Sequence, residues 1–236
     1  MLSLALASTA AAVGAITLNP TNQVPGGSVT VDGTGFGASR AVGIGFGDEM
    51  SGSNTDMAYN GTGMGPYTGR VSNYPITPGS FILTSDTSSG GGGGIVSTYT
   101  DVGDGTTIWS YDGTVMGTIN YVTGEWSRTT TVDVTGIAAN YSATYKYRMN
   151  FTPAAGIATS PTGTFSASIT LPDFIDNGNY TVTAIDTAGN KATSTLNVVP
   201  EGLTIGVMVL LSAVAVVVGT RYFKKQKIKS STQVNL

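Results

Sequence analysis

Residues 163–198 read GTFSASITLPDFIDNGNYTVTAIDTAGNKATSTLNV, and this stretch decides the fold class. Apolar and polar side chains alternate in three runs, which is the period of a half-buried β-strand. The side chains expected to face the core are Phe165, Ala167 and Ile169 in the first run, Tyr180, Val182 and Ala184 in the second, and Ala192, Thr193 and Leu196 in the third. Asp186-Thr-Ala-Gly-Asn190 supplies the turn between the last two runs, because Gly and Asn adopt positive φ at low cost. Three antiparallel strands are predicted here.

The rest of the chain has a similar character. Its 236 residues include 33 Gly and many Ser and Thr, and only 11% of them are charged. Gly and Ser weaken helices, whereas Thr, Val, Ile and Tyr fit the pleated surface of a sheet. A chain of this length can also bury a hydrophobic core without cross-links, so the absence of Cys is no obstacle. The predicted fold class is all-β.

A second alternating stretch lies near the start of the chain. Residues 28–33 (SVTVDG) and 41–46 (AVGIGF) alternate, with Pro25-Gly26-Gly27 before them and Gly33-Thr-Gly-Phe36 between them. A generic β-hairpin would explain this piece alone. Together with residues 163–198, however, the order resembles an IPT/TIG-type immunoglobulin-like domain. The resemblance implies an immunoglobulin-like β-sandwich split into residues 16–49 and 161–199.

Residues 50–160 would then be a β-rich module inserted between strands of that sandwich. Such an insertion is tolerable because the entropy of loop closure grows only logarithmically with length. Short strands are predicted at 106–111, 117–121, 125–132 and 142–147, with a reversal at Thr123-Gly124. Residues 50–94 show no such pattern and are expected to form a loop, which ends in the Gly-rich linker 88–94.

The strongest single signal is an uncharged apolar stretch, Leu203–Thr220, which reads LTIGVMVLLSAVAVVVGT. Its length and composition predict a transmembrane α-helix within an anchor at 200–223. Five of the 11 basic residues follow at once, namely Arg221, Lys224, Lys225, Lys227 and Lys229. By the positive-inside rule the tail 224–236 is cytoplasmic. The chain is therefore predicted to be a single-pass membrane protein with its bulk outside the cell.

Both borders of this extracellular part carry processing-like sequences. Val199-Pro200-Glu201-Gly202, with the apolar segment and the basic tail, resembles the Pro-Glu sorting signals of archaeal cell-surface proteins. Those signals have Phe after Pro-Glu, where this chain has Gly202, so removal and retention of the anchor both stay open. Residues 1–15 are expected to be a signal peptide ending near Val13-Gly14-Ala15, with a short apolar membrane segment or a buried first strand as the alternatives.

The composition limits the chemistry. Without Cys or His the chain has no thiol nucleophile, no Ser-His triad and no Cys or His metal ligands. Paired carboxylates are the remaining catalytic option, and the candidates are Asp101, Asp104, Asp112, Glu125 and Asp133. Because nothing in the sequence aligns two of them across a cleft, no catalytic residue, cofactor or enzyme activity is predicted. Asp101 and Asp104 are weak calcium candidates, with an ordinary Asp-Gly turn as the alternative.

Other features bear on partners. Four sequons, at Asn60, Asn140, Asn150 and Asn179, are candidates for N-glycosylation outside the cell. Trp109 and Trp126 belong either to a binding face or to the core. All 14 acidic residues precede the last five basic ones, so the extracellular part is acidic and nucleic acid is not expected as a partner.

These features predict a non-enzymatic, membrane-anchored cell-surface protein with a structural or adhesive role, in the envelope or associated with an S-layer. Its expected partners are the membrane, other envelope proteins and copies of itself. An alternative is the subunit of an extracellular filament or lattice that assembles by β-strand addition, with a free N-terminal strand as donor. A surface hydrolase is a third reading.

Overall fold

The computed structural model describes residues 14–60, 65–86, 96–109, 111–129, 140–151, 156–200, 210, 212–218 and 220–221, and these are mostly β-strand. The strands are β1 (Ala15–Asn19), β2 (Asn22–Gln23), β3 (Ser28–Thr34), β4 (Ala41–Asn54), β5 (Tyr59–Asn60), β6 (Tyr67–Arg70), β7 (Ile82–Asp86), β8 (Val96–Asp101), β9 (Thr106–Trp109), β10 (Val115–Ile119), β11 (Glu125–Arg128), β12 (Asn140–Asn150), β13 (Ile157–Ala158), β14 (Phe165–Thr170), β15 (Gly178–Asp186) and β16 (Lys191–Val198). The prediction of an all-β chain is confirmed.

The strands form two sheets. One has the order β1-β3-β14, and the other has the order β2-β16-β15-β4-β12-β7-β8-β9-β10-β11-β6-β5, with β13 also paired to β4. The pairing of β2 with β16 is parallel, and the pairings on either side of β4 are antiparallel. The large sheet therefore runs through both parts of the molecule described below.

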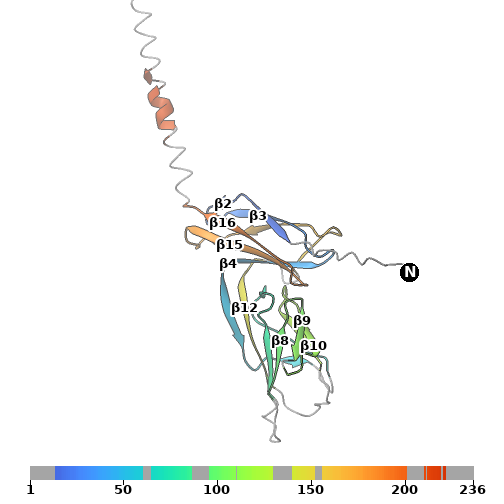
Figure 1. Cartoon of the computed structure of the whole chain (residues 1–236). Coiled ribbons are helices and arrows are strands. Elements are labelled where there is room, and N and C mark those ends of the chain that lie inside the picture. The colour runs from blue at the N-terminus through green and yellow to red at the C-terminus, as the bar shows by residue number, and fades with distance from the viewer. Residues whose placement is uncertain are drawn as a thin grey trace, which may run out of the picture.

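The small sheet packs on β4, β15 and β16, and we call this part, residues 14–46 and 156–200, the base (Figure 1). Alternation explains its core, because every second side chain of these strands points inward. Val31, Ile44, Val182 and Leu196 come from four different strands and are fully buried. The expectation for Thr193 is wrong: it is exposed, since it lies out of phase with the buried positions of β16.

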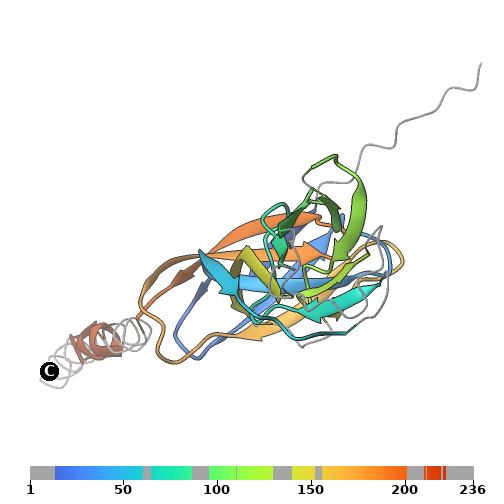
Figure 2. The ribbon, with the colours of Figure 1, turned by 90° about the horizontal axis from the view of Figure 1, so that it is seen from below.

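A second part, residues 47–148, extends from the base, and we call it the arm. The long strand β4 connects the two parts, because residues 42–46 pair with β15 and residues 50–54 pair with β12. The arm has its own core, which includes the fully buried Phe81, Tyr121 and Tyr141. Figure 1 shows the arm below the base, and Figure 2, seen from below, shows its green strands in front of the base.

The expectation of a loop throughout 50–94 is wrong, because part of this range forms strands. The second half of β4, together with β5, β6 and β7, lies in this range. Its Gly, Ser and Asn residues give little alternation, and the strands are held by partners that are distant in sequence, such as β12 and β11. The linker 88–94 lies outside the described residues.

Base and arm meet through glycines. Gly189, in the β15–β16 turn, faces the arm so closely that a Cβ there would lie well inside contact distance of the Gly103 carbonyl oxygen, and 3.3 Å from the Tyr121 ring. A Cβ on Gly156 of the base would lie 2.6 Å from Cγ1 of Val122 in the arm. Side chains at these positions would force the two parts to separate.

The predicted chain ends fall largely outside the described residues. Of the segment 1–15 only Gly14 and Ala15 are described, and Ala15 begins β1. Within the predicted anchor 200–223, residues 210, 212–218 and 220–221 are helical. Searching the described residues finds no helix of the length and apolarity needed to cross a membrane. The tail 224–236 is not among them.

Candidate functional site

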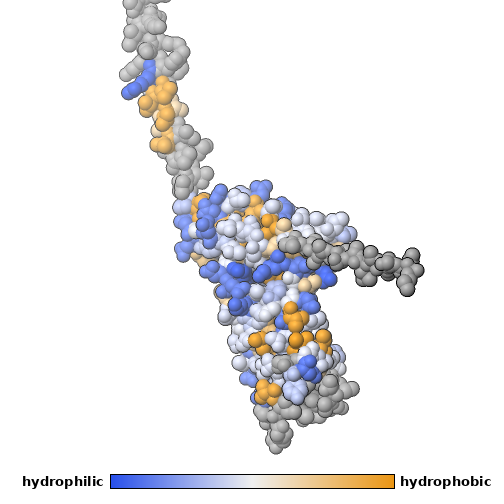
Figure 3. Space-filling view, viewed as in Figure 1, coloured by the Kyte–Doolittle hydropathy of each residue, from blue (hydrophilic) through white to orange (hydrophobic). Residues whose placement is uncertain are grey.

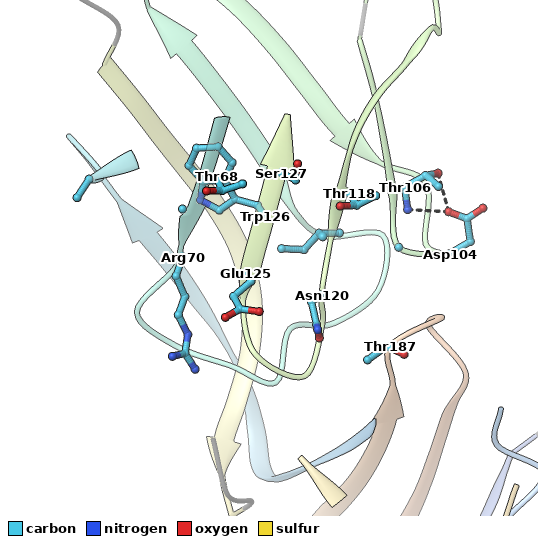
Figure 4. Close-up of a pocket in the computed structure, with 14 residues that line it drawn as sticks. Thr68, Arg70, Asp104, Thr106, Thr118, Asn120, Glu125, Trp126, Ser127 and Thr187 are labelled. Atoms are coloured by element: carbon cyan, nitrogen blue, oxygen red, sulfur yellow. Dashed lines mark hydrogen bonds between the residues drawn. The ribbon is translucent and has the colours of Figure 1, made fainter. Parts of the chain in front are cut away.

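A cleft of about 830 Å³ lies on the outer face of the arm, next to the base. Four neighbouring strands, β6, β11, β10 and β9, form its floor, and Thr187 of the β15–β16 turn lies at its edge (Figure 4). Side chains alternate between the two faces of each strand, so the residues that flank the buried core residues point into the cleft. Most of the residues that line the cleft are therefore polar.

Four hydroxyl side chains form a straight row across this floor. Thr68 on β6 pairs in register with Ser127 on β11, Ser127 pairs with Thr118 on β10, and Thr118 pairs with Thr106 on β9. Neighbouring strands are about 4.8 Å apart, so the row spans roughly 14 Å. Within the part of the chain that the structure describes, no hydrogen bond is found for the hydroxyls of Thr68, Thr118 and Ser127, so they are available to a ligand.

A second row, closer to the base, carries charge. Arg70 and Glu125 are register partners on β6 and β11, and both are exposed. The Arg70 Nε donates to the Thr123 carbonyl oxygen at 2.6 Å, and its guanidinium lies 4.5 Å from the Tyr74 ring centroid. The Glu125 carboxylate accepts from the Thr123 hydroxyl at 3.1 Å. These contacts hold one cation and one anion at fixed places beside the hydroxyl row.

Asp104 is the third charged group of the cleft. Its Oδ1 accepts hydrogen bonds from the Thr106 hydroxyl at 2.7 Å and the Thr106 N–H at 2.9 Å. These bonds hold the pKa of the Asp104 carboxyl below its ordinary value. The structure thus brings Asp104 and Glu125 to one cleft, which the sequence did not predict. A glycosidase acid needs a raised pKa, and Asp104 has the opposite shift.

The other carboxylates that were candidates for a catalytic pair do not line the cleft in the part of the chain that the structure describes. Asp112 is exposed in the β9–β10 turn, where Oδ1 accepts from the Thr114 N–H at 2.9 Å. Asp133 lies outside the described residues. Asp101 is buried in the arm, and its two oxygens are already occupied by donors, as described next.

Asp101 organises the turns around it. Oδ1 accepts from the Tyr121 hydroxyl at 2.6 Å and the Gly103 N–H at 2.8 Å, and Oδ2 accepts from the Gly79 N–H at 2.6 Å. Burial raises the pKa of Tyr121 well above its ordinary value, and the bond to Asp101 raises it further. Of the two calcium candidates, Asp101 is surrounded by N–H and O–H donors, whereas Asp104 lines the cleft. Among the described residues no group of three or more acidic side chains could hold a metal ion.

Most of the described aromatic side chains of the arm belong to its core. Trp126 is 2% exposed and packs against Tyr141 with ring centroids 5.1 Å apart, which agrees with the core alternative. The Trp109 side chain lies outside the description. Arg128, a residue not singled out by the sequence, is also buried: its Nη1 donates to the Tyr141 hydroxyl at 2.7 Å, and its guanidinium lies 4.5 Å from the Tyr99 ring centroid. Its charge is stabilised by tyrosines.

The four sequons are spread over the molecule. Asn140 at the start of β12 and Asn179 in β15 are exposed, whereas Asn150 is half-buried at the end of β12. Asn60 is the last residue of β5, and its side chain is not described. Asn140, Asn150 and Asn179 do not line the cleft. Among the sequons whose side chains are described, Asn140 and Asn179 are therefore the exposed ones.

Comparison of the chain with models of known protein families and with curated proteins gives no match. The cleft is therefore interpreted from its own residues. Most of them were not predicted, because Thr68, Thr118 and Ser127 are ordinary outward-facing strand residues. The only local signal is the alternation of hydroxyl with charged or amide groups, as in Thr68-Gly-Arg70 and Glu125-Trp-Ser127.

Proposed function

We propose that the chain is a non-enzymatic cell-surface protein that holds its arm away from the membrane. The main support is the course of β16. It begins at the turn that contacts the arm and ends at Val198, so its eight residues carry the chain about 26 Å to the other end of the base. The predicted anchor follows directly, so it is attached at the end of β16 that is remote from the turn in contact with the arm.

The anchor itself is proposed from the sequence of residues 203–220, which carry no charge. Its described side chains Val214, Val216, Val217 and Val218 are apolar and between 53% and 65% exposed (Figure 3). Apolar side chains with so little cover are suited to lipid. The basic residues that follow favour a cytoplasmic tail.

We further propose that the base is an immunoglobulin-like sandwich and that the arm is a module inserted into it. The three-stranded sheet facing β4, β15 and β16 supports this assignment, as does the parallel pairing of β2 with β16. The two separate hydrophobic cores support the division into two parts. A base that carries an arm with an exposed polar cleft suits an adhesive or envelope role.

Single cysteines test the proposed orientation cleanly, because the chain has none of its own. Tyr111→Cys introduces a thiol at a position that is 84% exposed in the arm, and Ser231→Cys introduces one in the predicted tail. A membrane-impermeant maleimide should label Tyr111→Cys on intact cells and Ser231→Cys only after lysis. The reverse pattern would refute the orientation, and a mature protein that lacks residue 231 would indicate that the anchor is removed.

A lattice or filament subunit is the second candidate. The observation that favours it is the edge of the small sheet, where β14 pairs with β3 on one side and with no other strand among the described residues. Unpaired edge groups are a template for a strand from another copy. The purified protein should then sediment as oligomers whose size grows with concentration. A monomer at all concentrations would exclude this candidate.

A further inference from the structure

The geometry points to a glycan as the ligand of the cleft, specifically an extended oligosaccharide without charge. The first reason is the kind of group that the floor offers. Thr68, Ser127 and Thr118 present hydroxyls that can both donate and accept, and the Thr106 hydroxyl, which donates to Asp104, can still accept. A ligand with hydroxyls along its whole length can satisfy such a row, whereas an apolar ligand would leave it unpaired.

The second reason is what the cleft does not offer to a peptide. Its floor is the face of a sheet, so the backbone groups of β6, β11, β10 and β9 are already used between these strands. A peptide could not add here as another strand, because strand addition needs a free edge. Ile119 and Trp126, the large apolar residues at the floor, are each only 2% exposed and provide no pocket for a side chain.

The third reason is charge. One guanidinium, from Arg70, stands against the carboxylates of Glu125 and Asp104 among the lining residues that the structure describes. This balance repels polyanions such as acidic polysaccharides and nucleic acids. Carboxylates and a guanidinium also form strong hydrogen bonds to hydroxyls, so they fit a neutral ligand.

The dimensions agree with a chain of several sugar rings. The hydroxyl row spans roughly 14 Å across four strands, with one hydroxyl at each strand spacing of about 4.8 Å. A sugar ring is of similar length, so successive rings can meet successive strands. Because the described part of the floor exposes no aromatic ring for stacking, binding should be weak. Three or four net hydrogen bonds correspond to a dissociation constant on the order of 1 mM.

This inference rests on the proposed function only for the origin of the ligand, since an outward-facing cleft would meet glycans outside the cell. The cleft can therefore be tested on the purified full chain, in a detergent without a sugar headgroup. The probes are neutral hexasaccharides, namely β-1,4-linked and α-1,4-linked glucose and β-1,4-linked mannose, with hexagalacturonate as the acidic comparison. Ligand-observed NMR titration measures each dissociation constant.

Thr118→Val removes one of the two inner hydroxyls of the row with little change of shape, and Val is favourable in strands. Thr98→Val is the matched control, because Thr98 is a half-buried residue of β8 that does not line the cleft. At least one neutral hexasaccharide should bind, and Thr118→Val should weaken it about three- to tenfold. Thr98→Val should bind like the unaltered chain.

Three results would overturn the inference. They are the absence of binding by every neutral probe, equal affinity of Thr118→Val and Thr98→Val, and tighter binding of hexagalacturonate than of the neutral probes. Unchanged Trp fluorescence of each variant shows that the arm is folded. Failure of the cysteine-labelling experiment would remove the proposed cell-surface location but would leave this measurement intact, so the two proposals can fail separately.

Discussion

Replacing Gly189 by alanine is expected to weaken the contact between base and arm. Gly189 has a φ of 84°, and an alanine in this left-handed region costs about 1–2 kcal/mol. The new Cβ would also collide with the Gly103 carbonyl oxygen across the junction. Relieving such an overlap typically costs about 1–3 kcal/mol. The free energy of unfolding should therefore fall by about 2–5 kcal/mol.

Gly113→Ala provides the matched control. Gly113 lies in the β9–β10 turn of the arm with a φ of 76°, and a Cβ there would meet nothing within 4 Å. This variant should lose only the backbone cost of about 1–2 kcal/mol. The difference between the two variants measures the junction contact itself.

Thermal unfolding of the purified protein, followed by circular dichroism and by Trp fluorescence, provides the assay. Both tryptophans, Trp109 and Trp126, are in the arm, so fluorescence reports the arm while circular dichroism reports all strands. For a protein of this size 1 kcal/mol shifts Tm by roughly 2–4 °C, so Gly189→Ala should melt about 10 °C lower and Gly113→Ala about 5 °C lower. Equal Tm values of the two variants would refute the role assigned to the junction.

Three further perturbations follow from the buried polar groups of the arm. Asp101→Ala should lower the free energy of unfolding by about 3–5 kcal/mol, because the donors of Tyr121, Gly79 and Gly103 lose their acceptor. Arg128→Met should change it by less than about 1 kcal/mol, since a buried charge is replaced by an apolar side chain of similar volume, whereas Arg128→Ala should cost about 3 kcal/mol. Above pH 10 Tyr121 should by itself lower the free energy of unfolding by about 1.4 kcal/mol per pH unit, because its raised pKa keeps it protonated in the folded state while the unfolded state loses its proton.

Denaturant unfolding checks all three. The stabilisation from Tyr121 is fully present below pH 10 and is lost as the pH rises, so Tyr121→Phe should flatten the alkaline slope. Burial also raises the pKa of Tyr141, so part of the loss of stability at alkaline pH should remain in Tyr121→Phe. The first prediction is contradicted if Asp101→Ala is as stable as the unaltered protein. The second is contradicted if Arg128→Met loses as much stability as Arg128→Ala, and the third if Tyr121→Phe leaves the alkaline slope unchanged.

The local sequence was sufficient to predict a strand where that strand is half-buried and regular. The second run of residues 163–198, with Tyr180, Val182 and Ala184 expected to face the core, is β15, and the Asp186–Asn190 turn lies where Gly189 was expected to allow it. Alternation carries this information because one face of the strand is in the core. The strand at Tyr67–Arg70 was missed for the opposite reason. Tyr67 is its only apolar side chain, and the next residue on the same face is Gly69, so no alternation is visible.

The cleft could not be predicted because it depends on register between strands that are distant in sequence. Thr68 meets Ser127 only because β6 pairs with β11, and Ser127 meets Thr118 only because a hairpin joins β10 to β11. The hairpin was visible in the Thr123-Gly124 turn, but the position of β6 was not. A shift by one residue in either pairing would turn the hydroxyls to the core face.

The junction and the cleft share one turn, and this links stability to binding. Asp104 and Gly105 line the cleft together with Thr187, and a Cβ on Gly105 would lie 3.1 Å from the Thr187 carbonyl oxygen across the junction. A movement of the arm away from the base would therefore widen the cleft and separate its groups. A ligand at ten times its dissociation constant should raise the free energy of unfolding by about 1.4 kcal/mol. Gly189→Ala should weaken binding of that ligand while Gly113→Ala leaves it unchanged, and equal affinities would mean that the cleft keeps its shape without the junction.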